Sequence, residues 1–387
     1  MKTVAVIFGG RSTEHDVSVV TAIASIIKPL ELSKQYKVEP VYIAKDGSWY
    51  WDEKLKDIKL YQSGEIDELR RRAPKVHLLF DNGLTLVKSS QFAGRKMYKK
   101  IDVVFPAMHG THGEDGELMG ILEMANVAYV GCGVAASAVA MDKVLAKQVV
   151  EASGIKSTPW VWFNSSDLSR HQSQIIKSLA HLRYPLFVKP AHLGSSIGIS
   201  RVETEKELIN ALEVAAHYDD KVIVEQGVNN LVEVTLPIIG NDQPQPALLE
   251  QPLTRPEDFF DFDTKYMQGG KKGKAGGKSS GSQGYSQIPA DLPKELYAKA
   301  EQTGVEVYKA LGCSGIARVD MLVDTKAGQA YFNEVNPLPG GLYAHNWAKT
   351  GISNVDLVQK LVDLAEERWS ARQKMTTSFS TNYLKQF

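Results

Sequence analysis

Residues 315–336, GIARVDMLVDTKAGQAYFNEVN, form the stretch that decides the fold. Two runs of β-type residues flank a short turn that contains a glycine, a pattern typical of an antiparallel hairpin. Side chains two positions apart on a strand share a face, so Arg318 and Asp320 point to the same side of the first strand. Glu334 and Asn336 do the same on the second strand. The pattern therefore predicts one face with two carboxylates, an amide oxygen and a guanidinium group.

Hard oxygen ligands at this density suit Mg²⁺, which typically takes one or two carboxylates, waters and substrate phosphates. The alternative is a solvated strand face with a surface ion pair. The flanking residues are apolar, and so polar a face beside a core favours a functional role. We therefore interpret Asp320, Glu334 and Asn336 as candidate metal ligands.

A second stretch with chemical content is PLFVKPAHLGSSIGIS, residues 185–200. Lys189 ends an apolar strand, where a lysine is costly to bury without an anionic partner. The Gly/Ser loop that follows could present backbone N–H groups to phosphate oxygens. It lacks the G-x-x-x-x-G-K-[ST] spacing of a P-loop, so an ordinary turn is the alternative.

Two further clusters follow predicted strands near the N-terminus. FGGRSTEHDVS, residues 8–18, opens a helix directly after the first strand, which is the geometry of an anion or small-ligand site. Glu14 could instead simply occupy a first helical turn, where acidic residues are favoured. HGTHGEDGELMG, residues 109–120, contains an H-x-x-H pair. That pair alone is weak evidence for a metal, and we interpret the segment as a structured ligand loop.

Composition excludes several classes of protein. The 387 residues carry 45 Lys and Arg against 45 Asp and Glu, and this neutral balance argues against bulk nucleic-acid binding. Cys132 and Cys313 are too few for a disulfide framework or a thiolate zinc site and are expected to be small buried hydrophobes. No run of about 18 apolar residues indicates a membrane span. The expectation is a cytoplasmic α/β enzyme.

The order of predicted elements indicates two or three domains. Strands over residues 3–8, 38–44 and 101–107, with a helix over 16–30 that Pro29 limits, predict a parallel sheet covered on both faces. Residues 52–100 form a polar excursion. A long helical pattern over 135–154 then leads into a small α+β module, and a third part begins near residue 231. The expected domains are 1–134, 135–230 and 231–387.

The small module is expected from strands over 186–189, 199–202 and 222–225, with a helix over 204–216. The third part has a helix over 294–311 and the hairpin. A glycine- and lysine-rich tract over 267–284 interrupts it. This tract is either a disordered surface excursion or a lid that orders over ligands.

Taken in order, these stretches resemble the D-alanine–D-alanine ligase family of the ATP-grasp superfamily. The similarity covers nearly the whole chain, and its markers are GGRSTEHDVS, HGTHGEDG, YVGCGVAASAVAMDK, VKPAHLGSSIG, VIVEQGV, DTKY, ARVDMLVD and NEVNPLPG. The resemblance implies a three-domain α/β ATP-grasp fold with an N-terminal parallel-sheet (pre-ATP-grasp) domain. ATP would lie between the second and third domains. The implied activity joins two D-alanines through an acylphosphate, for peptidoglycan precursor synthesis.

The resemblance also implies roles for single residues. Glu14 matches the group that binds the first amino acid's ammonium, and His109 a group near its carboxylate. Arg318 and the amide of Gly340 match the oxyanion donors. Ser195 matches a serine that links Glu14 to a tyrosine over the active site, here Tyr266. The residues matching ATP-binding positions are Lys143, Lys189, Ser195, Ser196, Glu225 (adenine amino group), Val228, Glu233 (ribose) and Lys265.

The implied cofactors are ATP and two Mg²⁺ or Mn²⁺ ions held by Asp320, Glu334 and Asn336, with a monovalent cation as a further option. The implied partners are small-molecule amino acids and a second copy of the chain in a homodimer.

The sequence departs from the family where the second substrate binds. PLPGGLYAHNW, residues 337–347, places His345 and Asn346 where the family has a serine for that substrate's carboxylate. Met119 replaces a usual glutamine. Protonated His345 could hold a carboxylate, or it could select another acceptor such as D-lactate or D-serine.

Three other readings stay open. One is a ligase for an unrelated small peptide, and another is a nucleotide sensor without catalysis. The sensor is disfavoured because it would tolerate loss of Arg318 or Asp320, and both are present. An NAD-dependent oxidoreductase would need G-x-G-x-x-G after the first strand, and that spacing is missing.

Overall fold

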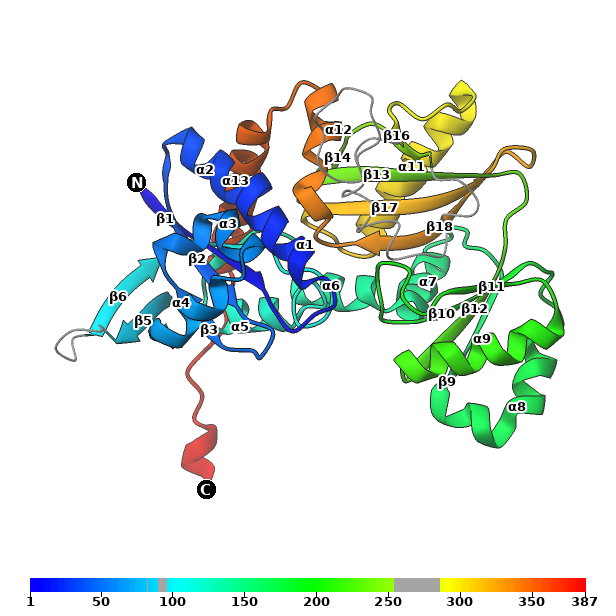
Figure 1. The fold of residues 1–387 in the computed structure, drawn as a ribbon, viewed down its shortest axis with the longest axis horizontal. Helices are drawn as coiled ribbons and strands as arrows, with labels where there is room; N and C mark the ends of the chain where they lie inside the picture. Colours follow the sequence, from blue (N-terminus) through cyan, green and yellow to red (C-terminus); the bar gives the residue numbers. More distant parts are fainter. Residues whose placement is uncertain (82, 90–95, 254–285) are drawn as a thin grey trace.

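The computed structural model describes residues 1–81, 83–89, 96–253 and 286–387. Its first part is an α/β domain around a five-stranded sheet of order β3-β2-β1-β7-β8 (Figure 1). Four strands run parallel and β3 adds an antiparallel edge. The strands are β1 (Lys2–Gly9), β2 (Tyr36–Ile43), β3 (Trp49–Trp51), β7 (Val103–Pro106) and β8 (Ala128–Tyr129). This arrangement confirms the predicted parallel sheet.

Strand β1 is buried on both faces, as expected for a central strand in a covered parallel sheet. Val4, Val6 and Phe8 join one hydrophobic core, while Ala5 and Ile7 join another on the opposite side. The first core is covered by α1 (His15–Val20), η1 (Thr21–Ile27) and α2 (Lys28–Ser33), and the second by α5 (Glu117–Met124).

The helical run after β1 extends to Ser33, beyond the predicted limit at Pro29. Pro29 follows the π-helical segment η1, and the backbone stays helical at Ile27 and Lys28, so the proline does not end the run. The excursion after β3 contains short helices and a three-stranded antiparallel sheet. Its elements are η2 (Glu53–Lys56), α3 (Ile58–Gln62), α4 (Ile66–Arg72), β4 (Val76–Phe80), β5 (Leu84–Ser89) and β6 (Lys96–Ile101).

The predicted small α+β module is confirmed as an antiparallel sheet of order β11-β10-β12-β9 with two helices. Side chains from the sheet and both helices form one core. The elements are β9 (Trp160–Asn164), α8 (Ser165–Leu179), β10 (Leu186–Pro190), β11 (Ser200–Val202), α9 (Glu205–Tyr218) and β12 (Lys221–Gln226).

The third part contains an antiparallel sheet of order β14-β13-β17-β18. The predicted hairpin is β17 and β18, and the predicted helix is α11. Helix α13 packs its buried face into the core of the first domain. The elements are β13 (Leu231–Gly240), β14 (Gln245–Pro246), β15 (Gln251–Pro252), β16 (Ser286–Gln287), α11 (Lys294–Ala310), β17 (Gly315–Asp324), β18 (Gln329–Asn336), η6 (Gly340–Tyr343), α12 (Ala344–Lys349) and α13 (Asn354–Gln373).

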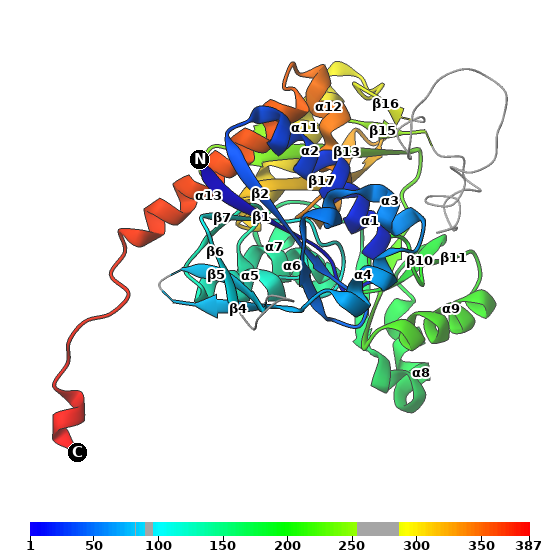
Figure 2. The ribbon, with the colours of Figure 1, turned by 60° about the vertical axis from the view of Figure 1, so that its left-hand side comes forward.

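Beyond α13 the chain leaves the body of the molecule and ends in η7 (Tyr383–Gln386), as Figure 2 shows. Cys132 and Cys313 are both buried in the core around the third sheet, as predicted. Over the described ranges, no helix is both long and apolar enough to span a bilayer. Lys265, Tyr266 and the tract over 267–284, for which the sequence predicts ligand contacts or a lid, lie outside the described residues.

The helical stretch between the first domain and the small module differs from the prediction of one helix. It consists of α6 (Val134–Met141) and α7 (Lys143–Ala152), separated at Asp142. The Asp142 carboxylate accepts hydrogen bonds from the amides of Val144 at 2.9 Å and Leu145 at 3.1 Å, so it caps a new helix. The buried faces of both helices join the core of the third sheet. Val144 of α7 also packs against Ala191 and Ile223 of the small module, so α7 contacts both parts of the chain.

Candidate active site

The hairpin β17–β18 presents the polar face that the sequence predicts. Asp320 lies directly opposite Glu334, and Arg318 lies opposite Asn336. Directly opposed residues of an antiparallel pair point to the same side of the sheet. Arg318 Nε also donates to Asp320 Oδ1 at 2.7 Å, with a second bond from its terminal nitrogen to the other carboxylate oxygen. The predicted grouping of these four side chains is confirmed.

The neighbouring strand β13 extends this face. Thr235 lies opposite Asp320, and Glu233, two residues away, therefore points to the same side. Burial alone would lower the pKa of Lys189, but the charge of Glu225, with those of Glu334 and Glu233, raises it above its ordinary value. The face of the third sheet thus meets the small module, where Lys189 ends β10.

A β-bulge in the hairpin adds a residue that the sequence pattern does not reveal. Glu334 opposes Asp320 but Phe332 opposes Met321, so Asn333 is an extra residue in β18. Bulges of this kind redirect side chains and are frequent beside active sites. The Asn333 side-chain oxygen accepts a hydrogen bond from Lys189 Nζ at 3.3 Å. The bulge therefore links the hairpin directly to the strand-end lysine.

Two buried lysines flank one buried glutamate at the meeting of the small module and α7. Lys189 Nζ lies 3.0 Å from Glu225 Oε2, and Lys147 Nζ lies 3.5 Å from Glu225 Oε1. Burial alone would raise the pKa of Glu225, but the two lysines outweigh it and hold that pKa below its ordinary value. The expected anionic partner of Lys189 is therefore Glu225. The predicted contact of Glu225 with adenine stays a prediction.

Lys143 begins α7 and reaches across to two other parts of the site. Its Nζ donates to the carbonyl oxygen of Leu193 at 2.7 Å, in the Gly/Ser loop. The same Nζ lies 3.6 Å from Glu334 Oε2 on the hairpin. A cation between this loop and the carboxylates is well placed to attract the phosphates of a nucleotide.

Glu14 comes from the first domain and meets the Gly/Ser loop. Ser195 Oγ donates a short hydrogen bond to Glu14 Oε1. Burial raises the pKa of Glu14, and the charge of Glu334 adds to this, while Ser195, Arg318 and Lys143 oppose it. Glu14 of the first domain thus interacts electrostatically with Glu334 and Arg318 of the hairpin. The predicted Ser195–Glu14 link is present, and its continuation to Tyr266 lies outside the described residues.

The glycine at position 110 is required by this arrangement. Gly110 has φ +72°, and a Cβ there would lie 2.5 Å from Ser12 Oγ and 3.0 Å from Glu14 Oε2. Its amide donates to Glu114 Oε1 at 2.8 Å. The loop over residues 109–120 is thus a structured wall of the site, as predicted.

His109 is buried at the base of this wall. Its Nε2 lies 3.0 Å from the Thr21 hydroxyl oxygen, which also accepts the Gly341 amide at 3.1 Å. Burial lowers the pKa of His109 to about 4, so it is neutral at pH 7. His112 instead lies near the surface with Nδ1 2.6 Å from Glu117, so the two histidines do not share a site. Thr21, which contacts His109, thus joins the first domain to the segment that contains the predicted oxyanion donor, Gly340.

The remaining residues with predicted nucleotide contacts are Ser196, Val228 and Glu233. Ser196 follows Ser195 in the loop, and both have left-handed backbone angles, φ 53° and 61°. Val228 lies two residues beyond the end of β12 and is half-buried. Glu233 lies on the face of β13 already described. Their contacts with ATP stay predictions.

His345 and Asn346 have different surroundings. His345 Nε2 lies 2.9 and 3.0 Å from the two carboxylate oxygens of Glu250, and its ring stacks near Tyr343 at 5.2 Å between centroids. Tyr343 in turn lies under Arg318, 5.1 Å from ring centroid to guanidinium carbon. This chain of contacts connects His345 to the hairpin face.

Asn346 does not fit the predicted substrate contact. It is fully buried. Its side-chain oxygen accepts from the Leu248 amide at 3.1 Å, and its nitrogen donates to the Leu248 carbonyl at 2.9 Å. An amide engaged at both ends within the core supports the fold and is not available to a ligand. Asn346 also donates to Glu250 Oε2 at 3.1 Å, so it helps to hold the carboxylate that contacts His345. The contact of His345 with a substrate stays a prediction.

The carboxylate and amide oxygens of the hairpin suit a divalent cation. Asp320, Glu334 and Asn336 provide hard oxygen donors on one face, the set that Mg²⁺ prefers. With its amide oriented so that both ends are satisfied, Asn336 donates its nitrogen to Glu114 Oε2 at 3.0 Å. Glu114 thereby fixes the orientation of the predicted ligand.

Several residues of the site escape the sequence reasoning. Lys147 carries a usable signal, because it lies one helical turn after Lys143 and so shares its face. Glu114 lies in the loop that the sequence analysis singles out, but its contact with Asn336 is long-range. Asn333 and Glu250 carry no signal, since a bulge and a long-range contact bring them to the site.

The fold and this arrangement of lysines, carboxylates and arginine define an ATP-grasp ligase. Residues 3–132 match the family described as D-ala D-ala ligase N-terminus, and residues 149–363 match D-ala D-ala ligase C-terminus. The chain belongs to the D-alanine–D-alanine ligase family, whose members are ATP-dependent carboxylate–amine ligases.

Individual relatives agree with this membership. The chain is 39% identical over 392 residues to a D-alanine–D-alanine ligase of Acetivibrio thermocellus, covering 96% of this chain and 98% of that one. Among solved structures, the Coxiella burnetii D-alanine–D-alanine ligase has a TM-score of 0.77 at 28% identity, covering 96% of each chain. The VanG D-Ala:D-Ser ligase of Enterococcus faecalis has a TM-score of 0.76 at 33% identity, covering 94% and 99%.

Proposed function

We propose that this chain uses ATP to join two D-alanines into a dipeptide for peptidoglycan precursor synthesis. The observation that carries the proposal is the convergence of three parts on one site. Glu14 and Ser195 meet there, Lys143 spans the Gly/Ser loop and Glu334, and the hairpin supplies Arg318 beside the carboxylates. The names of the relatives supply the substrate class.

In the proposed reaction, the carboxylate of the first D-alanine attacks the γ-phosphate of ATP, and ADP leaves. The neutral amine of the second D-alanine then attacks the acylphosphate carbonyl, and phosphate leaves. Glu14 holds the first ammonium, and Lys143 and Lys189 hold the phosphates. Arg318 and the Gly340 N–H stabilise the oxyanion of the second step. Mg²⁺ held by Asp320, Glu334 and Asn336 would neutralise charge on the transferred phosphoryl group.

The direct test is phosphate release from ATP across a panel of D- and L-amino acids and D-lactate, with each product identified by mass. We expect release with D-alanine alone, in amounts equal to the D-alanyl-D-alanine formed. Release that required an L-amino acid, or ATP turnover without a dipeptide, would contradict the proposal. A mixed product with D-serine or D-lactate would keep the reaction and change the acceptor.

The acceptor is expected to depend on His345. The contacts of His345 with Tyr343, and of Tyr343 with Arg318, support this expectation, and Glu250 holds the His345 ring. A hydrogen bond to a charged substrate group contributes about 1.5–3 kcal/mol, so His345→Ala should raise the KM for the second D-alanine by about 10–100-fold. The measurement is the rate of phosphate release against D-alanine concentration, fitted to two binding sites.

His217 offers a matched control. It is an exposed histidine on α9, a helix of the small module and not of the domain that contains the hairpin. His217→Ala should leave both KM values unchanged. If His345→Ala shifted the KM of the first D-alanine instead of the second, the assignment of His345 to the acceptor would be wrong.

A further inference from the structure

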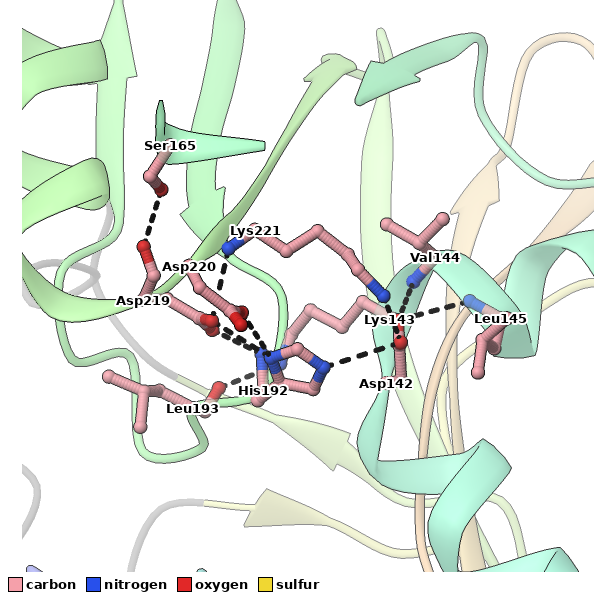
Figure 3. A network of polar contacts seen from close by, with 10 residues as sticks. All are labelled: Asp142, Lys143, Val144, Leu145, Ser165, His192, Leu193, Asp219, Asp220 and Lys221. Atoms are coloured by element: carbon pink, nitrogen blue, oxygen red, sulfur yellow. Dashed lines mark hydrogen bonds and ion pairs between the residues drawn. The ribbon is translucent and has the colours of Figure 1, made fainter. Parts of the chain in front are cut away.

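A charged cluster next to the Gly/Ser loop has no role in the reaction described so far. His192 lies immediately before the loop of residues 193–198, between acidic residues from two other segments (Figure 3). Its Nδ1 lies 2.8 Å from Asp219 Oδ1 on one side, and its Nε2 lies 3.3 Å from Asp142 Oδ2 on the other. The imidazole therefore bridges two carboxylates.

Asp142 connects this bridge to the start of α7. It caps the helix that begins with Lys143, and it also pairs with Lys221 at the start of β12. The Lys143 amide donates to the carbonyl of Ala191 at 3.1 Å. The first turn of α7 is therefore bound to the chain just before the loop through both His192 and the backbone.

Asp219 holds the other side. Its second carboxylate oxygen accepts the backbone amide of His192 at 2.7 Å, and its first accepts the amide of Lys221 at 3.2 Å. Asp219 follows α9, so the helix end, the start of β12 and the loop entrance are joined at one carboxylate. Asp220 Oδ1 is also near, at 3.7 Å from His192 Nδ1.

We propose that His192 is a positioning residue whose imidazolium, held between Asp142 and Asp219, keeps Lys143 and the loop of residues 193–198 at the spacing needed to contact one triphosphate. The inference rests on the proposed function in that ATP is the ligand. It goes beyond that function because His192, Asp142 and Asp219 touch no substrate in the proposed reaction.

The contacts of His192 with the two carboxylates favour its protonated, positively charged form. Hydrogen bonds to Asp142 and Asp219 outweigh the effect of burial and raise the pKa of His192 to about 9. The charged groups around the ring are Asp142, Asp219 and Asp220, with Lys221 on the far side of Asp142. Below about pH 9 the ring is cationic and can donate to both carboxylates, and above it the ring is neutral and keeps one N–H donor. His192, Asp219 and Asp220 are close enough together to suggest a metal site. We do not interpret them as one, because the His192 nitrogen that would bind a metal is already hydrogen-bonded to Asp219.

The alternative is that the cluster only stabilises the small module. Nucleotide affinity as a function of pH separates the two, because fold stability alone would not link the affinity to the titration of one imidazole. The experiment measures binding of a non-hydrolysable ATP analogue with MgCl₂ to the full-length protein by calorimetry between pH 7 and 10. The variants are His192→Asn, which keeps an N–H donor without charge, and Asp219→Asn. His181→Ala is the control, since His181 is an exposed histidine of the same module.

At pH 7.5 we expect His192→Asn to bind the analogue about tenfold more weakly, the size typical of one lost charged hydrogen bond. The wild-type affinity should fall as pH rises through about 9, and His192→Asn should lack this step. Asp219→Asn should move the step to lower pH, because it removes an anion that favours the imidazolium. His181→Ala should match the wild type.

Equal affinity of His192→Asn and wild type at pH 7.5, or the same alkaline step in both, would overturn the positioning role. If His192→Asn failed to fold, Asp219→Asn would decide, with the His192 titration read by NMR in the absence of ligand. An unchanged titration midpoint in that variant would overturn the proposal. If the wild-type protein bound no ATP analogue, the proposed function itself would be overturned. If the wild type bound it and the variants bound it equally well, only the positioning role of His192 would be overturned.

Discussion

Replacing Arg318 with alanine is expected to lower kcat by about 10²–10³-fold, the loss typical for one oxyanion donor. The guanidinium is held in place before substrate arrives, by two hydrogen bonds to Asp320 and by the Tyr343 ring beneath it. Burial alone would lower the pKa of Arg318, but Asp320 raises it well above its ordinary value, so the donor is charged at every working pH. The measurement is steady-state phosphate release at saturating ATP and D-alanine.

A matched variant separates charge from geometry. Arg318→Lys keeps the positive charge but loses the planar pair of donors, so it should fall between alanine and wild type. Affinity for the ATP analogue should remain measurable in both, because the lysines that hold phosphates are intact. Near-normal kcat in Arg318→Ala, with the fold confirmed by circular dichroism, would show that Arg318 does not stabilise the transition state.

The hairpin shows why part of this site could be predicted from sequence. The period of two along a strand is a local property, so the common face of Arg318 and Asp320 follows from their spacing alone. The pairing of the two strands follows from the short turn between them. The register that runs from Asp324–Gln329 to Met321–Phe332 would, if continued, place Asn333 opposite Asp320, and the bulge at Asn333 brings Glu334 there instead. The spacing therefore predicts which residues share a face within each strand, but the alignment of the two polar faces depends on the bulge.

Other features depend on contacts that no local pattern encodes. The bulge at Asn333 shifts the register by one residue, and its side chain meets a lysine 144 positions away. Glu250 reaches His345 from 95 positions away. The sequence contains one signal for the helix break at Asp142, since aspartate is a favoured N-cap. The apolar spacing continues through Asp142, however, and favours one long helix.

The departures from the family pattern illustrate the same limit. His345 and Asn346 are adjacent in sequence and were both predicted to meet the acceptor. In the structure both contact Glu250, but His345 is partly exposed, whereas Asn346 is fully buried and also bonded to the Leu248 backbone. Neighbours on a helix point in different directions, and only tertiary packing decides which of them faces the site.

Replacing Glu225 with glutamine is expected to lower the free energy of unfolding by about 3–5 kcal/mol, because removing one partner of a buried ion pair leaves the other charge uncompensated. Glu225 has two such partners, and Lys147 is fully buried. The measurement is urea unfolding followed by tryptophan fluorescence, to which Trp160, the partner of Glu225 on β9, contributes.

The loss should depend on pH in a defined direction. The pKa of Glu225 is lower in the folded protein than in the unfolded chain, so its contribution is present at neutral pH and disappears as pH falls through the folded value. The difference between wild type and Glu225→Gln should therefore shrink below about pH 4, the ordinary value for a glutamate. Glu213→Gln, an exposed change on α9, should cost no more than about 0.5 kcal/mol at any pH.

A double variant identifies the source of this loss. Lys147→Met combined with Glu225→Gln removes one of the two stranded charges and fills the space with an apolar side chain of similar length. If uncompensated buried charge is the cause, the double variant should be more stable than Glu225→Gln alone. If the double variant were only as stable as Glu225→Gln, the loss would come from the packing of the Glu225 side chain. Its role as counter-ion to the lysines would then be contradicted. In the double variant Lys189 is the remaining buried cation. Without Glu225, its charge would be stabilised by the Asn333 side-chain oxygen and, when nucleotide is bound, by the phosphates.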